Sequence, residues 1–482
     1  MHFVVPEGHI FMDKHTLLSP RLISVAAIVF IAVLVGSLLP LYVDAMDAGF
    51  ARSMALPVVL LLGLLLLYSR IWLLLLILLF RSCGDIFLES TKFSIGAMQI
   101  GVGGLINVFV ILIALLLMVE KPAILPKKML SMWGPFLILA LLGIVIAPVK
   151  GDAIRLYLAL ISYFAIFISA FYFVRSRDDF KRCVRLVLWS SVLPALYALF
   201  DIALHGGVTG PNGARLQSTF SHPNIFAFYL TLVISLGLYL LKSEAATLSN
   251  RNRLILAGYT FLLLALLMLT QTRSAWIACF LMFCAYGLFF QRRYLLYLVA
   301  LPLLALLIPS VRDRVLDLEA GNQVVQYAKL NSFAWRVYLW ESGFKWMRPA
   351  HYLLGYGLDS FQHFSPIFFP LAGKTHFNAH NIYVQWIFEL GAFGFLAYLW
   401  LYGRLLWILR KMLPKDKLGG FIMISLVIQY LMVSFSDNMA SYLVFNWYFW
   451  FVAGSACAVV AADSRSETIS AGQKMRGDQR GA

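Results

Sequence analysis

The sequence has little charge and lacks the motifs of several large protein classes. Only 13% of its 482 residues are charged, whereas 61% are hydrophobic. It contains no GxxxxGK[ST] phosphate loop, so ATP-driven pumping is not indicated. Gly355 and Gly357 are too close together for a dinucleotide-binding fingerprint and follow no predicted strand, so they are typical of a tight turn.

Metal and disulfide patterns are also missing. The five cysteines are scattered without a CxxC pair, which argues against a disulfide framework and a metal site. Two carboxylate pairs could hold a metal. Asp178 with Asp179 falls on the expected cytoplasmic side, and Asp317 with Glu319 is a weak metal candidate that an ordinary solvated helix face explains better. We therefore expect no metal ion and no other cofactor.

Apolar runs of membrane-span length recur along the whole chain. Lipid cannot satisfy backbone polar groups, so such runs form helices, and no ten-residue alternating segments of a β-barrel are present. The sequence predicts an all-α, polytopic transmembrane bundle of about 12–14 spans. The expected spans are 21–40, 54–69, 71–82, 95–119, 131–147, 153–174, 183–204, 223–241, 254–270, 275–290, 294–309, 381–402, 419–435 and 442–461.

Basic residues form short clusters between these runs, which explains the formal charge of +16 as a topology signal and not as a nucleic-acid surface. The clusters fall on one side of the membrane if residues 54–82 form two helices broken near Arg70. The positive-inside rule makes that side cytoplasmic, together with both termini. The expected parts are a cytoplasmic segment 1–20 without a cleavable-signal pattern, a transmembrane bundle 21–309, a large periplasmic loop 310–380, C-terminal spans 381–461 and a disordered cytoplasmic tail 462–482.

Three predicted helices begin at the opposite, outer face with a basic residue near the first turn. Their starts are SHPN at 221–224, QTRSAW at 271–276 and NAHNIY at 378–383. Helix N-termini attract anions, and Arg215, Arg273 and His380 add donors, so these segments could form a diphosphate site. The alternative for Arg273 is a side chain that only reaches the lipid headgroups.

Several histidines could act as the base for such a site. His380 is followed by Asn381, and an imidazole can take a proton from a hydroxyl near neutral pH. His222, His363 and His376 are competing candidates, and an interfacial histidine without catalytic function is the alternative for each. His222 and Asn224 lie at the start of the 223–241 span and are possible supporting residues together with Asn381.

The long outer loop contains a segment that combines a cation with aromatic residues. Arg336, Trp340 and Phe344 recur every four residues and would share one face of a short helix. The alternative is an amphipathic helix lying on the outer leaflet, with Trp335, Tyr338 and Trp346 as interface anchors. Both could hold, with Arg336 turned toward a lipid-linked substrate.

With these motifs, the chain resembles the O-antigen ligase and Wzy-type polysaccharide polymerase superfamily of bacterial inner membranes. The matching pieces are Arg215 with FSHPN at 220–224, LTQTRSAW at 269–276, AWRVYLWESG at 334–343, LLGYGLDSF at 353–361 and AHNIYVQWIFELG at 379–391. The resemblance implies a GT-C-like enzyme that transfers glycan from undecaprenyl diphosphate to a sugar hydroxyl on the periplasmic face, without metal or nucleotide. By motif position it implies phosphate-binding roles for Arg215, Arg273 and Arg336, and a catalytic role for His380.

The resemblance leaves the member of the superfamily open. A polymerase would add repeat units to a lipid-linked glycan, whereas a ligase would move finished glycan onto lipid A-core in lipopolysaccharide biosynthesis. The HN form of the His380 motif favours the polymerase. A transporter of lipid-linked sugar is a more distant alternative, because most charges lie at span ends. The implied partners are the lipid-linked donor, the acceptor glycan or lipid A-core, membrane lipids and a chain-length regulator, without nucleic acid.

Overall fold

A computed structural model describes residues 55–90, 93–95, 98–100, 102–205, 215–305, 307, 312 and 332–478. The chain divides into two units. The first comprises residues 1–126, 162–190 and 450–482, and the second comprises residues 127–161 and 191–449. The expected span 21–40 and the carboxylates Asp317 and Glu319 lie outside the described residues.

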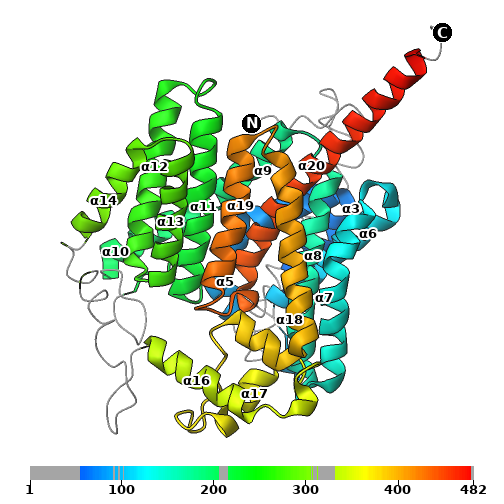
Figure 1. Cartoon of the computed structure of the whole chain (residues 1–482). Coiled ribbons are helices and arrows are strands. Elements are labelled where there is room, and N and C mark those ends of the chain that lie inside the picture. The colour runs from blue at the N-terminus through cyan, green and yellow to red at the C-terminus, as the bar shows by residue number, and fades with distance from the viewer. Residues whose placement is uncertain are drawn as a thin grey trace. The chain divides into compact units, whose positions relative to one another are not determined.

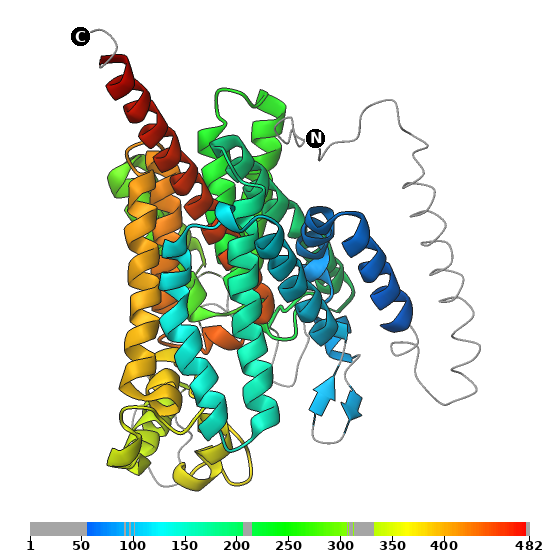
Figure 2. The ribbon, with the colours of Figure 1, turned by 90° about the vertical axis from the view of Figure 1, so that its right-hand side faces the viewer.

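The first unit contains a broken helix pair, a small hairpin and further helices. Its elements are α3 (Ala55–Tyr68), α4 (Arg70–Phe80), α5 (Asp85–Ser90), β1 (Phe93–Ile95), β2 (Met98–Ile100), α6 (Val102–Glu120) and α9 (Arg177–Ser190), with the end of α8 (Lys150–Ser169) and most of α20 (Leu443–Asp478). The antiparallel hairpin is visible in Figure 2. Ser69 caps α4 by accepting from the backbone N–H of Trp72 at 3.4 Å. The expected break near Arg70 is confirmed, and Arg70 forms an ion pair with Glu120.

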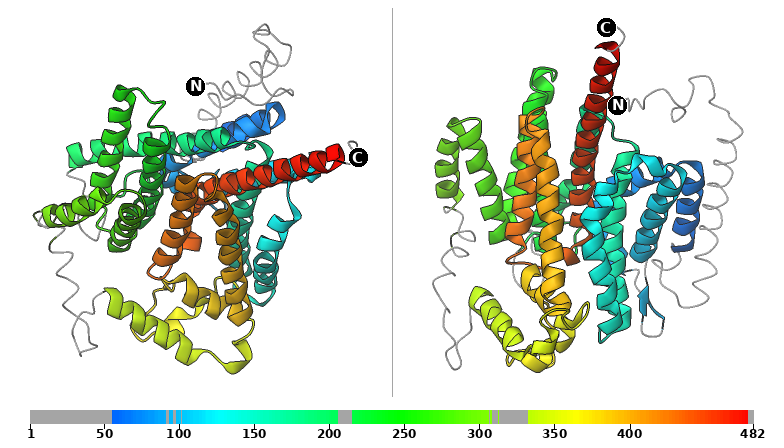
Figure 3. Two further views of the ribbon diagram at one scale, coloured as in Figure 1. Left: turned by 45° about the horizontal axis from the view of Figure 1, so that its top comes forward. Right: turned by 45° about the vertical axis from the view of Figure 1, so that its right-hand side comes forward.

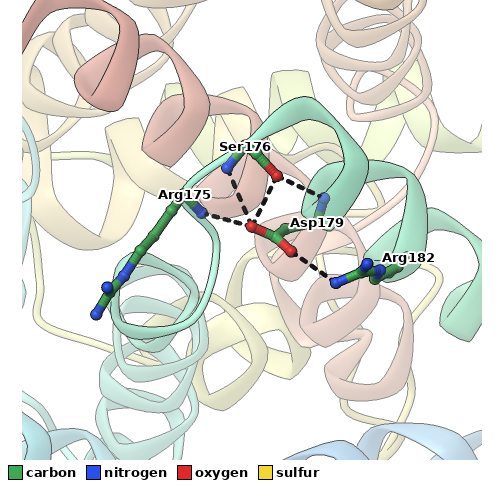
Figure 4. A network of polar contacts seen from close by, with 4 residues as sticks. All are labelled: Arg175, Ser176, Asp179 and Arg182. Atoms are coloured by element: carbon green, nitrogen blue, oxygen red, sulfur yellow. Dashed lines mark hydrogen bonds and ion pairs between the residues drawn. The ribbon is translucent and has the colours of Figure 1, made fainter. Parts of the chain in front are cut away.

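The start of α9 shows how a short polar sequence fixes a helix end. The Asp179 carboxylate accepts from the backbone N–H and hydroxyl of Ser176 at 3.1 and 2.9 Å, and the Asp179 backbone N–H donates to the Ser176 hydroxyl at 3.1 Å (Figure 4). Arg182 holds the other carboxylate oxygen at 3.1 Å. This reciprocal capping satisfies N–H groups that no helical carbonyl can reach.

The helix α20 continues through most of the segment expected to be a disordered tail, and Figure 3 shows it as one long helix. Residues 462–478 contain no proline and several good helix formers. Arg177 forms an ion pair with Asp463 at 3.3 Å, and Arg465 donates to the backbone carbonyl of Ile124 at 2.6 Å. These contacts within the first unit hold the part of the helix beyond residue 461.

The second unit is a bundle around α11 (Pro223–Ser243), whose side chains are almost all buried. In Figure 1 α11 lies beside α12 (Asn250–Leu269), α13 (Arg273–Phe289) and α19 (Lys417–Val433). A second pair is formed by α7 (Lys127–Ile146) and α18 (Ile382–Leu409). The remaining helices are α10 (Val192–His205), α14 (Arg293–Ala305), α16 (Ser332–Trp346) and α17 (Ser360–Phe368). Short 3-10 turns in the two units are η1 (Arg81–Cys83), η2 (Pro122–Ile124), η3 (Ala170–Tyr172), η4 (Pro349–His351), η5 (Arg410–Met412) and η6 (Met439–Ser441).

The all-α, multi-pass membrane architecture is confirmed. Within the described residues, eight helices are long and apolar enough to cross a membrane, and α13 and α19 are shorter apolar helices. The expected starts and ends of the described spans agree with the observed helices within a few residues for most spans. The main exceptions are 95–119, where residues 98–100 form β2 and α6 begins only at Val102, and the ends of 381–402 and 442–461, beyond which α18 and α20 continue. The expected span 183–204 consists of α9 and α10 in succession, which together form one of the eight candidate spans, Arg177–Leu204. The expected total of 12 to 14 spans stays a prediction, because residues 1–54 lie outside the described part.

The described part of the long loop folds around an aromatic core. Leu339, Trp340, Phe361, Phe368 and Phe388 are buried together, with α16 and α17 packed against the beginning of α18. The expected interface anchors Trp335, Tyr338 and Trp346 pack against this core, so they are not simply immersed in the outer leaflet. The loop is therefore a small helical cap on the second unit, at the lower end of α18 in Figure 1.

A backbone clasp joins this cap to α18. Gly391 interrupts the helix with φ 66° and ψ −165°, a conformation that essentially only glycine adopts. At the break, the carbonyl of Tyr352 accepts from the N–H of Ala392 at 2.8 Å, and the N–H of Gly357 donates to the carbonyl of Glu389 at 2.8 Å. The LLGYG segment thus satisfies the backbone groups that the break in α18 leaves open.

Candidate functional site

The three helices expected to begin at one face do begin together. We call this end of the second unit, where α11, α13 and α18 start, the site end. His222 caps α11 by accepting from the backbone N–H of Asn224 at 3.1 Å. Thr272 precedes α13, and Asn381 caps α18 by accepting from the N–H groups of Tyr383 and Val384 at 2.9 and 3.2 Å. Asn381, which is 2% exposed, therefore has a structural role at the site.

Arg215 connects the starts of two of these helices. Its Nε donates to the backbone carbonyl of Thr270 at 3.0 Å. One terminal nitrogen donates to Asn224 Oδ1 at 2.7 Å and to Thr272 Oγ1 at 3.0 Å. A guanidinium held by three protein oxygens is rigidly oriented, so its charge is fixed between the N-termini of α11 and α13.

Asp437 is the central residue that the sequence analysis did not assign to the site. It is 1% exposed, and its two oxygens accept from Asn224 Nδ2 at 2.6 Å and from the hydroxyl of Tyr442. Asn224 therefore bridges Arg215 and Asp437. The sequence places Asp437 in an outer turn, but only the fold brings that turn against the start of α11.

His380 lies beside this network in a strained backbone conformation. Its φ of 49° is in the left-handed region, which residues other than glycine rarely adopt. Burial lowers the pKa of His380 from its ordinary value of 6.5; the charge of Asp437 opposes this shift, and the charges of Arg336 and His222 add to it. The imidazole is therefore mostly neutral at pH 7 and able to accept a proton.

Arg336 belongs to the same group of residues, because its charge acts on His380, His222 and Tyr442. Within the described part of the chain, neither the Arg336 guanidinium nor the His380 ring has a hydrogen-bond partner. Neither has a buried unpaired nitrogen, so both can be reached from solvent. An unpaired cation next to a neutral base is suited to a substrate that carries both an anion and a hydroxyl.

Arg273 and two of the competing histidines are placed differently. Arg273 begins α13 and donates to the hydroxyl of Ser332 at 3.4 Å, so it links α13 to the start of α16. His363 and His376 are exposed, and His376 is 3.2 Å from the carbonyl of Gln362. Of the four candidate histidines, the structure brings together His380 and His222.

Backbone strain is concentrated near this group. Four non-glycine residues have positive φ among those described, and three of them, Ser218, Gln271 and His380, lie in the segments that lead into α11, α13 and α18. Such strain persists only where surrounding contacts impose it, and it is frequent at functional sites. In this chain it accompanies the turns that aim Arg215 and His380 into the site.

Comparison with known families agrees with this geometry. Residues 258–399 match the family model described as O-antigen ligase, Wzy_C. This segment of the chain is therefore similar to an O-antigen ligase domain. The match confirms the resemblance to the O-antigen ligase and Wzy-type polymerase superfamily. No curated protein matches the chain.

The O-antigen ligase domain covers only part of the site. It includes Arg273, Arg336 and His380, whereas Arg215, Asn224 and Asp437 lie outside residues 258–399. The family indicates surface polysaccharide assembly by a glycosyltransferase-like class of membrane protein, with a lipid-linked glycan and an acceptor as substrates. The site in the second unit is thus completed by segments before and after the matched domain.

Proposed function

We propose that this protein transfers glycan from undecaprenyl diphosphate to a sugar hydroxyl on the periplasmic face of the bacterial inner membrane, as a Wzy-type polymerase of O-antigen or exopolysaccharide. The observation that carries the proposal is the group formed by Arg215, Arg336 and His380 around Asp437. It combines two cations, one of them unpaired, with a neutral imidazole that solvent can reach.

The cations act on the donor. As the bond between the anomeric carbon and the diphosphate oxygen breaks, the leaving diphosphate gains negative charge. Arg336 is available for direct contact with phosphate oxygens, and Arg215 adds a fixed positive charge at the N-termini of α11 and α13. In this proposal Arg273 binds the same diphosphate from the start of α13. Because Arg215 is already oriented by the protein, its charge stabilises the leaving group without reorganisation during the reaction.

The histidine acts on the acceptor. His380 takes the proton of the acceptor hydroxyl while the hydroxyl oxygen forms the new bond to the anomeric carbon. The donor carries its own activated bond, so the reaction requires neither a nucleotide nor a metal. The displaced lipid diphosphate leaves with the electron pair of the broken bond, which balances the transfer.

The distribution of basic residues supports the orientation. The helices that start at the site end finish near basic residues, with Lys242 in the last turn of α11 and Arg410 directly after α18. Arg292 and Arg293 follow α13, and Lys417 begins α19. By the positive-inside rule, these basic residues support a cytoplasmic location for that end of the helices and a periplasmic location for the site end.

The deciding experiment uses purified full-length protein and a short native undecaprenyl-diphosphate oligosaccharide, with and without EDTA. We expect mass spectrometry to show EDTA-insensitive addition of repeat units to a second lipid-linked glycan. We also expect Arg336→Ala to lower transfer by about 10²-fold, because it removes a charge-assisted contact to the leaving group. Lys345→Ala, an exposed cation on the same helix paired with Glu341, is the matched control and should transfer at the wild-type rate.

The other acceptors separate the alternatives. Transfer that occurs only when lipid A-core is supplied would make the protein a ligase, which the description of the matched family favours. Movement of lipid-linked sugar across liposomes without any transfer would make it a transporter and exclude the proposed reaction.

Replacing Asp437 by asparagine tests the hydrogen-bond network that joins Arg215, Asn224 and Asp437, and the effect of the Asp437 charge on His380. Asparagine keeps the shape but cannot accept from both Asn224 and Tyr442 with the same strength, so the tether to Arg215 is weakened. We expect kcat/KM to fall by about 10- to 100-fold. Because the Asp437 charge raises the pKa of His380, its loss lowers that pKa further, and the acid limb of the pH–rate profile moves to lower pH.

The measurement is kcat/KM over about pH 5 to 8, where an imidazole titrates. Ser436→Ala is the matched control, since among the described residues this neighbouring hydroxyl bonds only to the carbonyl of Val433 in the same turn. A reduced rate with an unchanged acid limb would show that Asp437 does not act on the ionisation of His380.

A further inference from the structure

A group of aromatic side chains lies next to His380. We call it the aromatic wall, and it consists of Trp335, Tyr338, Phe369 and Phe377. Trp335 on α16 has its ring centroid 6.1 Å from that of His380, 5.0 Å from Phe377 and 5.2 Å from Phe369. Tyr338, three residues further along α16, lies 5.5 Å from Phe369. Residues three apart share a helix face, so Trp335 and Tyr338 are presented on the same side of α16.

The polar atoms of this wall are unpaired. Within the described residues, neither the indole N–H of Trp335 nor the hydroxyl of Tyr338 has a hydrogen-bond partner. Neither atom is among the buried unpaired groups, so both are open to solvent. The neighbouring Trp340 differs, since its indole N–H donates to the carbonyl of Ala379 at 2.6 Å and the side chain is 8% exposed. Packing explains Trp340, but it leaves the open N–H of Trp335 without a structural role.

We propose that Trp335, with Tyr338, forms the subsite that holds the acceptor sugar, an inference that rests on the proposed glycan transfer. A sugar ring has apolar C–H faces and a rim of hydroxyl groups. Aromatic side chains with a free N–H or O–H match both, because the rings cover C–H groups while the polar atoms bind hydroxyls. No charge is needed, which suits a neutral acceptor.

The position next to His380 selects the acceptor over the donor. The sugar whose hydroxyl loses its proton must lie against the base, and Trp335 is the aromatic ring in contact with His380. Of the cations that would bind the donor diphosphate, Arg336 acts on His380 through its charge, and Arg215 is joined to Asp437 through Asn224. The wall and the cations thus supply separate contacts for the two substrates around one base.

The first test is Trp335→Phe, which keeps an aromatic ring for packing and removes the N–H donor. The acceptor is the native oligosaccharide released from its lipid, which can accept glycan but cannot donate it. With the lipid-linked donor held constant, we expect the KM for this acceptor to rise about 5- to 10-fold, as for the loss of one neutral hydrogen bond. The KM for the donor and the kcat should stay within about twofold of wild type.

Trp346→Phe is the matched control. Trp346 lies on the same helix, and its ring centroid is 5.1 Å from those of both Tyr356 and Phe364, whereas the ring contact of His380 on this helix is with Trp335. It should leave the acceptor KM unchanged. Equal changes in both substitutions, or equal changes in the donor and acceptor KM of Trp335→Phe, would overturn the subsite and leave Trp335 a packing residue.

A second measurement needs no variant and no turnover. Tryptophans of the wild-type protein are oxidised with N-bromosuccinimide, and each peptide is quantified by mass spectrometry. The released oligosaccharide should protect Trp335 and leave Trp400 on α18 unprotected. If Trp335 is not protected, the subsite is wrong even when transfer occurs. If protection is seen but the wild type transfers no glycan to any acceptor, the proposed function fails while the sugar site stands.

Discussion

Replacing His380 by asparagine should lower glycan transfer by about 10²- to 10⁴-fold, the usual contribution of a general base. Asparagine tolerates the left-handed conformation that His380 adopts, so the backbone at φ 49° is retained while the imidazole is lost. Folding should therefore be preserved. The measurement is the single-turnover rate with saturating lipid-linked donor and acceptor.

The pH dependence identifies the role of the histidine. Burial holds the pKa of His380 below 6.5, so wild-type kcat/KM should be level near pH 7 and fall tenfold per unit once the pH drops below that pKa. The residual activity of His380→Asn should lack this acid limb. An acid limb that survives the substitution would assign the base to another group, with His222 as the nearest candidate.

His376→Asn is the control for this prediction. His376 lies in the same loop, is exposed and contacts the carbonyl of Gln362 at 3.2 Å, outside the group around Asp437. Its substitution should leave both the rate and the pH profile unchanged.

The largest effect on stability is expected for Gly391→Ala. A Cβ atom at this position would lie 2.3 Å from the carbonyl carbon of Leu353, a backbone atom that cannot turn aside. The φ of 66° and ψ of −165° add strain for any residue with a Cβ. We expect a loss of more than about 4 kcal/mol and failure of the clasp between the cap and α18.

The measurement is the fraction of monodisperse protein in detergent and its thermal unfolding midpoint. Gly403→Ala is the matched control in the same helix, because a Cβ there meets nothing within 4 Å. It should be neutral or slightly stabilising, since alanine favours helices over glycine. Wild-type stability of Gly391→Ala would show that the break in α18 can relax without cost.

The sequence alone predicted the membrane class, most of the long apolar helices and a set of candidate site residues. Apolar run length and the exclusion of unpaired backbone from lipid leave little choice of structure, so helix bounds could be read from composition. Helix starts were also readable, because caps are local: His222 and Asn381 precede the helices that they cap. The motif resemblance was confirmed by the match to the O-antigen ligase domain.

The aromatic residues of the long loop could not be placed in this way. Trp335, Tyr338 and Trp346 fit a lipid interface by composition, yet they pack against a core formed by α16, α17 and α18. The fifteen residues of α16 show no clear apolar periodicity that would reveal which side is buried. Their hydrophobic partners, such as Phe388, come from segments up to about fifty positions away in the chain, so the sequence of the helix does not indicate them.

The sequence determined which charged and polar residues lie near the starts of the helices. Only the tertiary structure decided which of these residues contact one another. Arg215, His380 and Asp437 are separated by many helices along the chain. Only side-by-side packing of α11, α13, α18 and α19 joins Arg215 to Asp437 through Asn224 and brings His380 within range of the Asp437 charge. Hydrogen bonds act over about 3 Å, and contacts between residues more than two hundred positions apart are not encoded in local sequence patterns. For that reason Asp437 could be found only in the folded protein.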